Sequence, residues 1–280
     1  EAARVCALRG HHVTVFERED RTGGQVNLAA RATWREALSG IVRWLDGQVR
    51  KLNVDLRLGH AATAADIALA SPDVVIMATG GQAILGDDPG SDLHHTTRDV
   101  LAGRVTPAGS VLLFDEMGQH NAASVAELLA TRGCLVELVT HDRLVAQEVG
   151  TTNQPVHLRE FYRLGVVTTP NMELTETWRE GNRLVAVLRN TMTGAEEERV
   201  VDHIVVDRGG APDTTLYDAL KTASLNAGQT DTHALVAGCP QPVMGQIGAG
   251  AYALFRIGDA VAARNVHAAL YDALRLCKDL

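Results

Sequence analysis

The sequence predicts an α/β protein made of two similar units, the second inserted into the first. A helix, a glycine and a strand at residues 1–17 recur at residues 122–140, this time preceded by another strand. Only 4% of the residues are aromatic, and small aliphatic residues dominate, which is typical of parallel sheets covered by helices. The 280 residues, 46% of them hydrophobic, are enough for a large core.

The composition also argues against several classes of protein. A net charge of −8 speaks against a nucleic-acid or anionic-membrane partner. The four cysteines are far apart, and the eleven histidines follow no ligand spacing, so we expect no bound metal. We find no secretory signal and no apolar run of about 18 residues, and therefore expect a cytoplasmic protein without a membrane partner.

The first unit opens with a helix over residues 1–9. Apolar residues recur there at helical spacing, and Gly10 occupies the position that glycine favours just past a helix end. A short β-branched and aromatic strand over residues 12–16 follows, and Glu17 closes it. A helix, a glycine, a strand and an acid are how a Rossmann βαβ unit ends.

The rest of the first unit alternates helices and strands. Residues 33–54 predict an amphipathic helix, because large apolar side chains recur every three or four residues from Trp34 onward. A polar-alternating strand at residues 53–58 and a short helix at 61–70 come next. A buried strand at residues 74–77 then ends in small residues.

The second unit begins after a loop-rich crossing at residues 84–107. A strand at 111–114, a helix at 122–131 and a strand at 135–140 repeat the opening pattern. Further along, residues 156–170 predict a helix and then a strand.

The second unit ends with residues 183–210, which predict a hairpin followed by a buried strand. The chain then returns to the first unit, where residues 233–241 predict another strand. A glycine-rich turn, the sequence IGDA and a long C-terminal helix, which IGDA opens, complete the chain. We therefore expect one nucleotide-binding domain at residues 1–100 plus 222–280, and an inserted one at residues 101–221.

Glu17 is the first candidate binding residue. An acid at the end of the second strand of a dinucleotide fold accepts hydrogen bonds from the adenosine ribose. It lies about 20 residues after the first glycine of the phosphate loop, a distance that reaches back beyond Glu1. We therefore expect the first strand and its glycine loop to be missing from this chain. The alternative is an ordinary solvated glutamate.

Three further motifs contain small residues at places where backbone approaches a ligand. Gly23 and Gly24 let backbone amides approach a pyrophosphate or flavin, and ATGG leaves room at the end of a buried strand. In IGDA, the aspartate can hold a ribityl hydroxyl while the following helix N-terminus faces phosphates. The alternatives are a flexible turn, a common strand ending and a plain N-cap aspartate. The candidate cofactor-binding residues are Glu17, Arg18, Gly23, Gly24, Gln25, Ala78, Thr79, Gly80, Gly258, Asp259, Ala260 and Asn265.

The order of these motifs resembles a known group of flavoproteins that contain two dinucleotide-binding domains. RTGGQVNLAA, DVVIMATGG and FRIGDAVAARNVHAALYDALRL resemble the C-terminal portion of the trimethylamine dehydrogenase and 2,4-dienoyl-CoA reductase family. The resemblance covers essentially the whole chain. The last phrase is closest to the branch that demethylates N-methylated amino acids such as dimethylglycine or N-methylproline.

This resemblance carries expectations about the full-length protein. Complete members carry an N-terminal (β/α)8 barrel with FMN and a [4Fe–4S] cluster, and their C-terminal portion holds FAD or, in trimethylamine dehydrogenase, ADP. The barrel is then a partner of this chain, electrons leave to an electron-transfer flavoprotein, and the full-length protein is a homo-oligomer. No substrate-oxidising residue is expected in these 280 residues.

The second unit departs from a nicotinamide-binding pattern. In the loop DEMGQHN after its first strand, Gly118 is the only glycine, and Asp115 and Glu116 put carboxylates where a pyrophosphate would lie. At about 4 Å, such a like-charge contact costs on the order of 1 kcal/mol in water. The next strand ends in Thr140 without an acid. This unit is thus expected to keep the fold and to lose strong NAD(P)H binding; the alternative is that Asp115 or Asp142 contacts a nucleotide in an altered pose.

These expectations lead to one main function and two alternatives. The main one is the FAD- or ADP-binding part of an FMN and iron–sulfur oxidoreductase that demethylates a small methylated amine or amino acid. The first alternative is the corresponding part of an NAD(P)H-dependent enoate or dienoyl-CoA reductase. The second is a non-catalytic docking module stabilised by a nucleotide.

Overall fold

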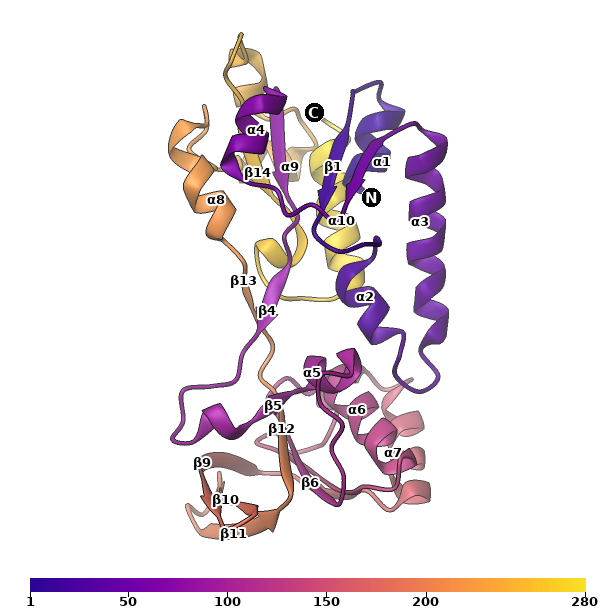
Figure 1. The fold of residues 1–280 in the computed structure, drawn as a ribbon, viewed down its shortest axis with the longest axis vertical. Helices are drawn as coiled ribbons and strands as arrows, with labels where there is room; N and C mark the ends of the chain where they lie inside the picture. The colour runs from indigo at the N-terminus through magenta and orange to yellow at the C-terminus, as the bar shows by residue number, and fades with distance from the viewer. The chain divides into compact units, whose positions relative to one another are not determined.

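The computed structural model describes residues 1–280, and the chain forms two compact units (Figure 1). Unit 1 contains residues 1–27, 39–82 and 210–280; unit 2 contains residues 28–38 and 83–209. These divisions differ from the expected boundaries near residues 100 and 222. Residues 83–100 pack into unit 2 and residues 210–221 into unit 1. The segment 28–38, expected in the first domain, belongs to unit 2.

Unit 1 has two separate pairs of parallel strands. β1 (Thr14–Glu17) pairs with β2 (Asp55–Leu58), and β3 (Val74–Met77) pairs with β14 (Ala253–Arg256). A further pair is formed by β4 (Gly81–Ala83), which ends at the unit boundary, and β13 (Gly210–Pro212). The helices are α1 (Ala2–Leu8), α2 (Gly24–Ala29, which crosses into unit 2), α3 (Ser39–Lys51), α4 (Ala64–Ala70), α8 (Thr215–Leu220), α9 (Thr232–Ala237) and α10 (Val266–Cys277).

Both faces of the β3–β14 pair are covered. Ala253 and Phe255 of β14 pack with the first and last helices, through Val5 of α1 and Leu276 of α10 among others. Successive strand side chains point to opposite faces, so the intervening Leu254 packs on the other side, against α4 and α8. This double burial explains why the strand is an unbroken apolar run.

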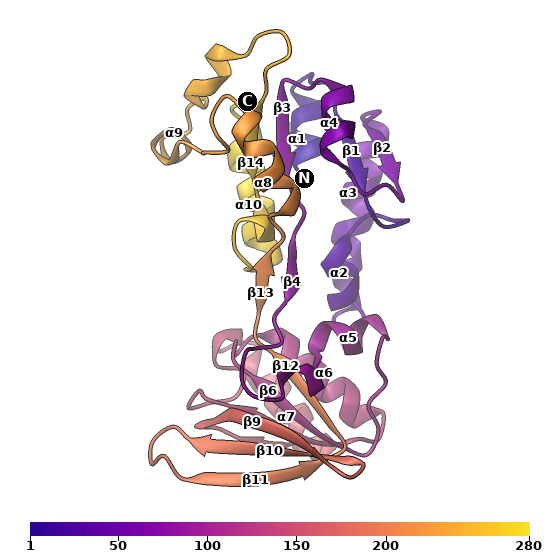
Figure 2. The ribbon, with the colours of Figure 1, turned by 60° about the vertical axis from the view of Figure 1, so that its left-hand side comes forward.

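Unit 2 is built on a five-stranded parallel sheet in the order β5-β12-β6-β7-β8. Its strands are β5 (His95–Thr96), β6 (Ser110–Asp115), β7 (Leu135–Thr140), β8 (Val167–Thr169) and β12 (His203–Asp207). The helices are α5 (Thr97–Ala102), α6 (His120–Thr131) and α7 (Gln154–Leu164). A separate antiparallel sheet contains β9 (Met172–Glu180), β10 (Arg183–Asn190) and β11 (Glu196–Val201), as Figure 2 shows.

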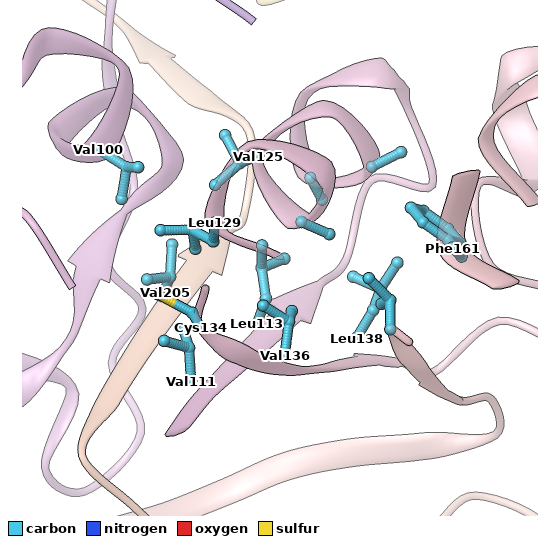
Figure 3. Close-up of a cluster of buried hydrophobic side chains, with 14 of the residues drawn as sticks. Val100, Val111, Leu113, Val125, Leu129, Cys134, Val136, Leu138, Phe161 and Val205 are labelled. Carbon is cyan, nitrogen blue, oxygen red and sulfur yellow. The ribbon is translucent and has the colours of Figure 1, made fainter. Parts of the chain in front are cut away.

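Unit 2 therefore has three layers, and the two-residue period of β6 shows them. Val111 and Leu113 point to the helices, where they meet Val125 and Leu129 of α6 (Figure 3). Leu112 and Phe114 point to the antiparallel sheet, in a cluster that includes Leu174 and Leu188. All four β6 side chains are buried, so both faces of the strand contribute to the core.

Most predicted elements are confirmed, and β3 and β7 have the expected bounds. The long helix starts at Ser39, not at residue 33: Trp34 has φ +49° and lies in the segment that belongs to unit 2. Residues 233–241 are not a strand, because Asp231 caps the N-terminus of α9, and Gly238 in the left-handed region ends it. The strand of this region is β14 instead.

The last helix also begins later than expected. GDA forms a single 3₁₀ turn over Gly258–Ala260, and α10 starts only at Val266, so IGDA does not open this helix. The third strand of the antiparallel sheet, β9, was not predicted. None of the helices is both long and apolar enough to cross a membrane.

Candidate functional site

The strands of unit 1 bring ATGG and GDA side by side. β3 and β14 are neighbouring parallel strands with Met77 opposite Arg256, so both motifs leave the sheet at the same edge. The approach is close: a Cβ at Gly81 would lie 2.6 Å from the Ala211 carbonyl oxygen and 3.6 Å from that of Asp259. Only glycine fits this position without moving backbone.

Hydrogen bonds hold the ATGG turn in place. The Thr79 hydroxyl donates to the Asp213 carbonyl at 2.8 Å, and the Asp213 N–H donates to the Gly80 carbonyl at 3.0 Å. The Gln25 amide nitrogen Nε2 donates to the Gly81 carbonyl at 3.2 Å. The structure thus brings together GGQ and ATGG, which are more than 50 residues apart in the sequence.

The two glycines of GGQ have different surroundings. Gly23 has φ +110°, and a Cβ there would lie 2.6 Å from Val42 and 2.7 Å from Asn27, so this glycine is needed for packing. Gly24, with φ +45°, starts α2 and would meet nothing within 4 Å. The open side of this turn is therefore at Gly24.

Glu17 ends β1, as expected, on the other strand pair of unit 1. Its Oε1 accepts a hydrogen bond from the Glu19 N–H at 2.9 Å and fixes the turn; no hydrogen bond reaches Oε2. Arg18 is exposed and lies 3.5 Å from the Glu19 carboxylate. Glu17 thus keeps one carboxylate oxygen for a hydroxyl donor. The Arg18 side chain is instead paired with Glu19 at the exposed surface.

The GDA turn depends on a residue that was not a candidate, Asp272 of α10. Gly258, with φ +60°, donates its N–H to Asp272 Oδ2 at 3.1 Å, and Arg264 forms an ion pair with the same carboxylate. Asp259 Oδ1 accepts from the Arg264 N–H at 3.2 Å. Gly258 lies so close to α10 that a Cβ would be 3.2 Å from Ala269.

The remaining candidates in this region, Ala260 and Asn265, are engaged in packing and helix capping within the protein itself. Ala260 is fully buried. Asn265 Oδ1 accepts from the Ala268 N–H at 2.9 Å and caps α10. Arg256, which was not predicted, stacks on Tyr217 with 4.1 Å between its guanidinium carbon and the ring centroid, and it donates to the Ala260 carbonyl. Its sequence signal was a lone arginine at the end of a buried strand.

The corresponding edge of unit 2 carries two buried carboxylates. Asp115 and Asp207 end β6 and β12 as register partners, and they are 0% and 4% exposed. Burial, followed by the charge of Asp207, raises the pKa of Asp115 to about 7. Burial also raises the pKa of Asp207. This edge therefore differs chemically from the small, glycine-rich edge of unit 1.

Unit 2 also contains a buried hydrogen-bonded chain that sequence reasoning missed. Glu127 Oε1 lies 2.6 Å from Nδ1 of His157, whose Nε2 lies 3.0 Å from Nδ1 of His120. The Thr33 hydroxyl and the Trp34 indole N–H donate to Glu127 Oε2. Burial lowers the pKa of His120 to about 4, helped by the nearby Arg35. These hydrogen bonds join segment 28–38 to α6 and α7. In the sequence, the only sign of them was the seven-residue spacing that places His120 and Glu127 on one helix face.

Two units of parallel strands, one with three small-residue motifs on its carboxyl side, are typical of the Rossmann-like fold of flavoproteins. No protein-family profile matches the chain. It is 48% identical to N,N-dimethylglycine/sarcosine dehydrogenase of Chromohalobacter salexigens, matching 100% of this chain and 42% of that protein. It is 42% identical to a probable N-methylproline demethylase of Rhizobium meliloti, matching 100% of this chain and 41% of that protein.

Solved structures agree on the fold. Histamine dehydrogenase from Rhizobium sp. 4-9 has a TM-score of 0.83 at 20% identity, over 100% of this chain and 42% of that one. Thioredoxin reductase of Lactococcus lactis has a TM-score of 0.68 at 17% identity, over 99% and 92%. The chain therefore belongs to the trimethylamine dehydrogenase and 2,4-dienoyl-CoA reductase family. It spans about two fifths of the length of the curated relatives it matches.

Proposed function

We propose that unit 1 binds FAD, or ADP in its place, as the nucleotide-binding part of a flavin-dependent oxidoreductase that demethylates a small N-methylated amine or amino acid. The observation that carries this proposal is the meeting of ATGG and GDA at neighbouring strand ends, with Gln25 bonded to the ATGG turn. Carboxyl ends of parallel strands are where such folds bind nucleotides.

The residues at this edge fit such a ligand. Glycine or alanine at most motif positions leaves backbone within reach of phosphates or a flavin ring, and Gly24 faces open space. The free Oε2 of Glu17 suits a ribose hydroxyl. Asp259 has one oxygen on the Arg264 N–H and its other oxygen for a ribityl hydroxyl. A bound flavin would supply electron transfer; this chain's residues would only hold and orient it.

The rest of the proposal concerns the longer protein. A barrel with FMN and a [4Fe–4S] cluster, an electron-transfer flavoprotein as acceptor and a homo-oligomeric state all follow from the family resemblance. The partial coverage of the relatives supports a larger protein. In unit 1 the β1–β2 and β3–β14 pairs are not hydrogen-bonded to each other, which leaves a place for a strand carrying the phosphate loop.

A second candidate function is reduction of an alkene with electrons from NAD(P)H. Its support is a 40% identical relative from Caballeronia cordobensis, described as a multifunctional alkene reductase/demethylase. We favour demethylation, because the edge of unit 2 that would receive the nicotinamide nucleotide carries Asp115 and Asp207, both buried.

The test uses the full-length protein under anaerobic conditions. Dimethylglycine, sarcosine and N-methylproline are added in turn, and flavin bleaching is recorded beside a reaction with NADH. We expect an N-methylated substrate to bleach the flavin rapidly and NADH to do so slowly or not at all. Rapid bleaching by NADH alone would favour the reductase.

A variant tests the nucleotide site in unit 1. Glu17→Gln should weaken retention of FAD or ADP about tenfold, since it removes a charged acceptor for a hydroxyl. Equilibrium dialysis against increasing dilution measures this, and Glu19→Gln, two residues away and exposed, is the matched control. Equal retention by both variants would remove Glu17 from the site.

A further inference from the structure

We propose that Asp115 and Asp207 act as built-in substitutes for phosphate oxygens, and that they exclude NAD(H) and NADP(H) from unit 2. The inference rests on the proposed function, which places the nucleotide in unit 1. It assigns the specificity against nicotinamide to two named side chains. By excluding these nucleotides, the two side chains would prevent NAD(P)H from donating electrons at unit 2.

Asp115 occupies the loop that follows β6. Its Oδ1 accepts hydrogen bonds from the backbone N–H groups of Met117 at 3.0 Å and Gly118 at 2.9 Å. In a nucleotide-binding loop, such amides point at a pyrophosphate. Here an oxygen of the chain itself takes both of them.

Asp207 is the second carboxyl group at this edge, and it lies near the start of α6. It lies opposite Asp115 on the neighbouring strand. Its Oδ1 accepts a hydrogen bond from the Gly209 N–H at 3.4 Å, and Asn121 and Ala122, in the first turn of α6, lie near enough to oppose the rise in its pKa that burial causes. The helix N-terminus that would attract a phosphate therefore already lies beside a carboxyl group of the chain itself.

The remaining space in this loop is also taken. A Cβ at Gly118 would lie 2.9 Å from Asp142 Oδ2, and the Glu148 N–H donates to the Gly118 carbonyl at 2.9 Å. Asp115 and Asp207 each keep an Oδ2 that is buried and has no hydrogen-bond partner. A nicotinamide pyrophosphate would have to displace the carboxyl oxygens of Asp115 and Asp207 from the backbone N–H groups that they occupy.

The two residues work by occupying donors, which makes the proposal testable with size-matched variants. Asp115→Asn keeps an acceptor oxygen for both amides, whereas Asp115→Ala frees them. The same pair of changes applies to Asp207. The full-length oxidised protein is titrated with NAD⁺ and NADP⁺, which cannot reduce its flavin. Binding is measured by calorimetry, and hydrogen–deuterium exchange locates it at residues 115–123.

We expect the wild type and both Asn variants to show no saturable binding up to roughly 1 mM. Asp115→Ala and Asp207→Ala should each bind at least about ten times more tightly, with new protection at residues 115–123. Micromolar binding by the wild type with protection there would overturn the proposal. So would folded Ala variants that bind no better than their Asn counterparts.

Micromolar binding by the wild type would overturn the proposal even where an Ala variant does not fold. The readout is also separate from amine oxidation. A protein that fails to oxidise any N-methylated substrate but shows the expected titrations would refute only the proposed function.

Discussion

Unit 1 and unit 2 share parallel strands covered by helices, but their carboxyl edges are opposite in chemistry. In unit 1, β3 and β14 are followed by alanine, glycine and single hydroxyl or acid groups, and Gly24 nearby faces open space. In unit 2, the strands β6 and β12 end in buried aspartates whose oxygens take the loop amides. A fold can thus persist while its ligand donors are used internally, so fold likeness alone does not show a site.

The largest expected effect concerns Asp115. Its folded-state pKa is raised, so the protonated form favours folding; that stability is complete below the ordinary pKa near 3.8 and is lost as pH rises through about 7. Asp115→Asn removes this titration. The variant should exceed the wild type in unfolding free energy by on the order of 4 kcal/mol at pH 8, and by much less at pH 5.

Urea unfolding at the two pH values measures the difference. Asp202→Asn, at a half-buried carboxylate whose pKa is lowered by hydrogen bonds from Ser110, is the control with the opposite sign. A wild type and Asp115→Asn variant that differ equally at pH 5 and 8 would contradict the raised pKa. The carboxyl edges of unit 1 and unit 2 would then differ less in their chemistry than the burial of Asp115 indicates.

A smaller effect is expected at the edge of unit 1. Gly81→Ala places a methyl group 2.6 Å from a backbone carbonyl, which cannot move as a flexible side chain would. The unfolding free energy should fall by about 2 kcal/mol, and cofactor retention should fall with it. Gly248→Ala meets nothing within 4 Å and should change stability by less than about 1 kcal/mol. Thermal melts that rank the two variants the other way would show that the edge tolerates bulk.

The smallest expected effect tests whether Asn265 only caps α10 or also contacts the bound nucleotide. Asn265 is bonded within α10, so Asn265→Ala should cost about 1 kcal/mol of stability. Asn265→Ser keeps an oxygen at the cap and should cost only a few tenths. If Asn265→Ser preserves the melting temperature but loses the nucleotide, Asn265 contacts the ligand as well.

How much of this was predictable depends on how local each feature is. β3, β7 and the α10 sequence followed from apolar periodicity within a few residues. Trp34 fitted a helical period but lies outside the helix, because its indole N–H bonds to Glu127, more than 90 residues away. At α9 the capping residues Asp231 and Gly238 outweighed an apolar run that we took for a strand.

The site shows the same division. The glycine and acid motifs were visible as short phrases, and their neighbouring positions follow from parallel pairing of β3 with β14. Asp272, Arg256 and the Glu127–His157–His120 chain were not foreseen. Each acts through a partner brought close only by tertiary packing, and a lone charged or histidine side chain carries no sequence signal of its own.

The interleaved chain path has a consequence for synthesis on the ribosome. Unit 2 is complete in sequence once residue 209 has emerged, whereas unit 1 needs residues 210–280 to join its first two segments. At ~5–20 residues per second, the N-terminal segments wait on the order of 10 s with their apolar faces uncovered. During translation the inserted unit should therefore mature first, and the early part of unit 1 is where we expect nascent-chain chaperones to bind.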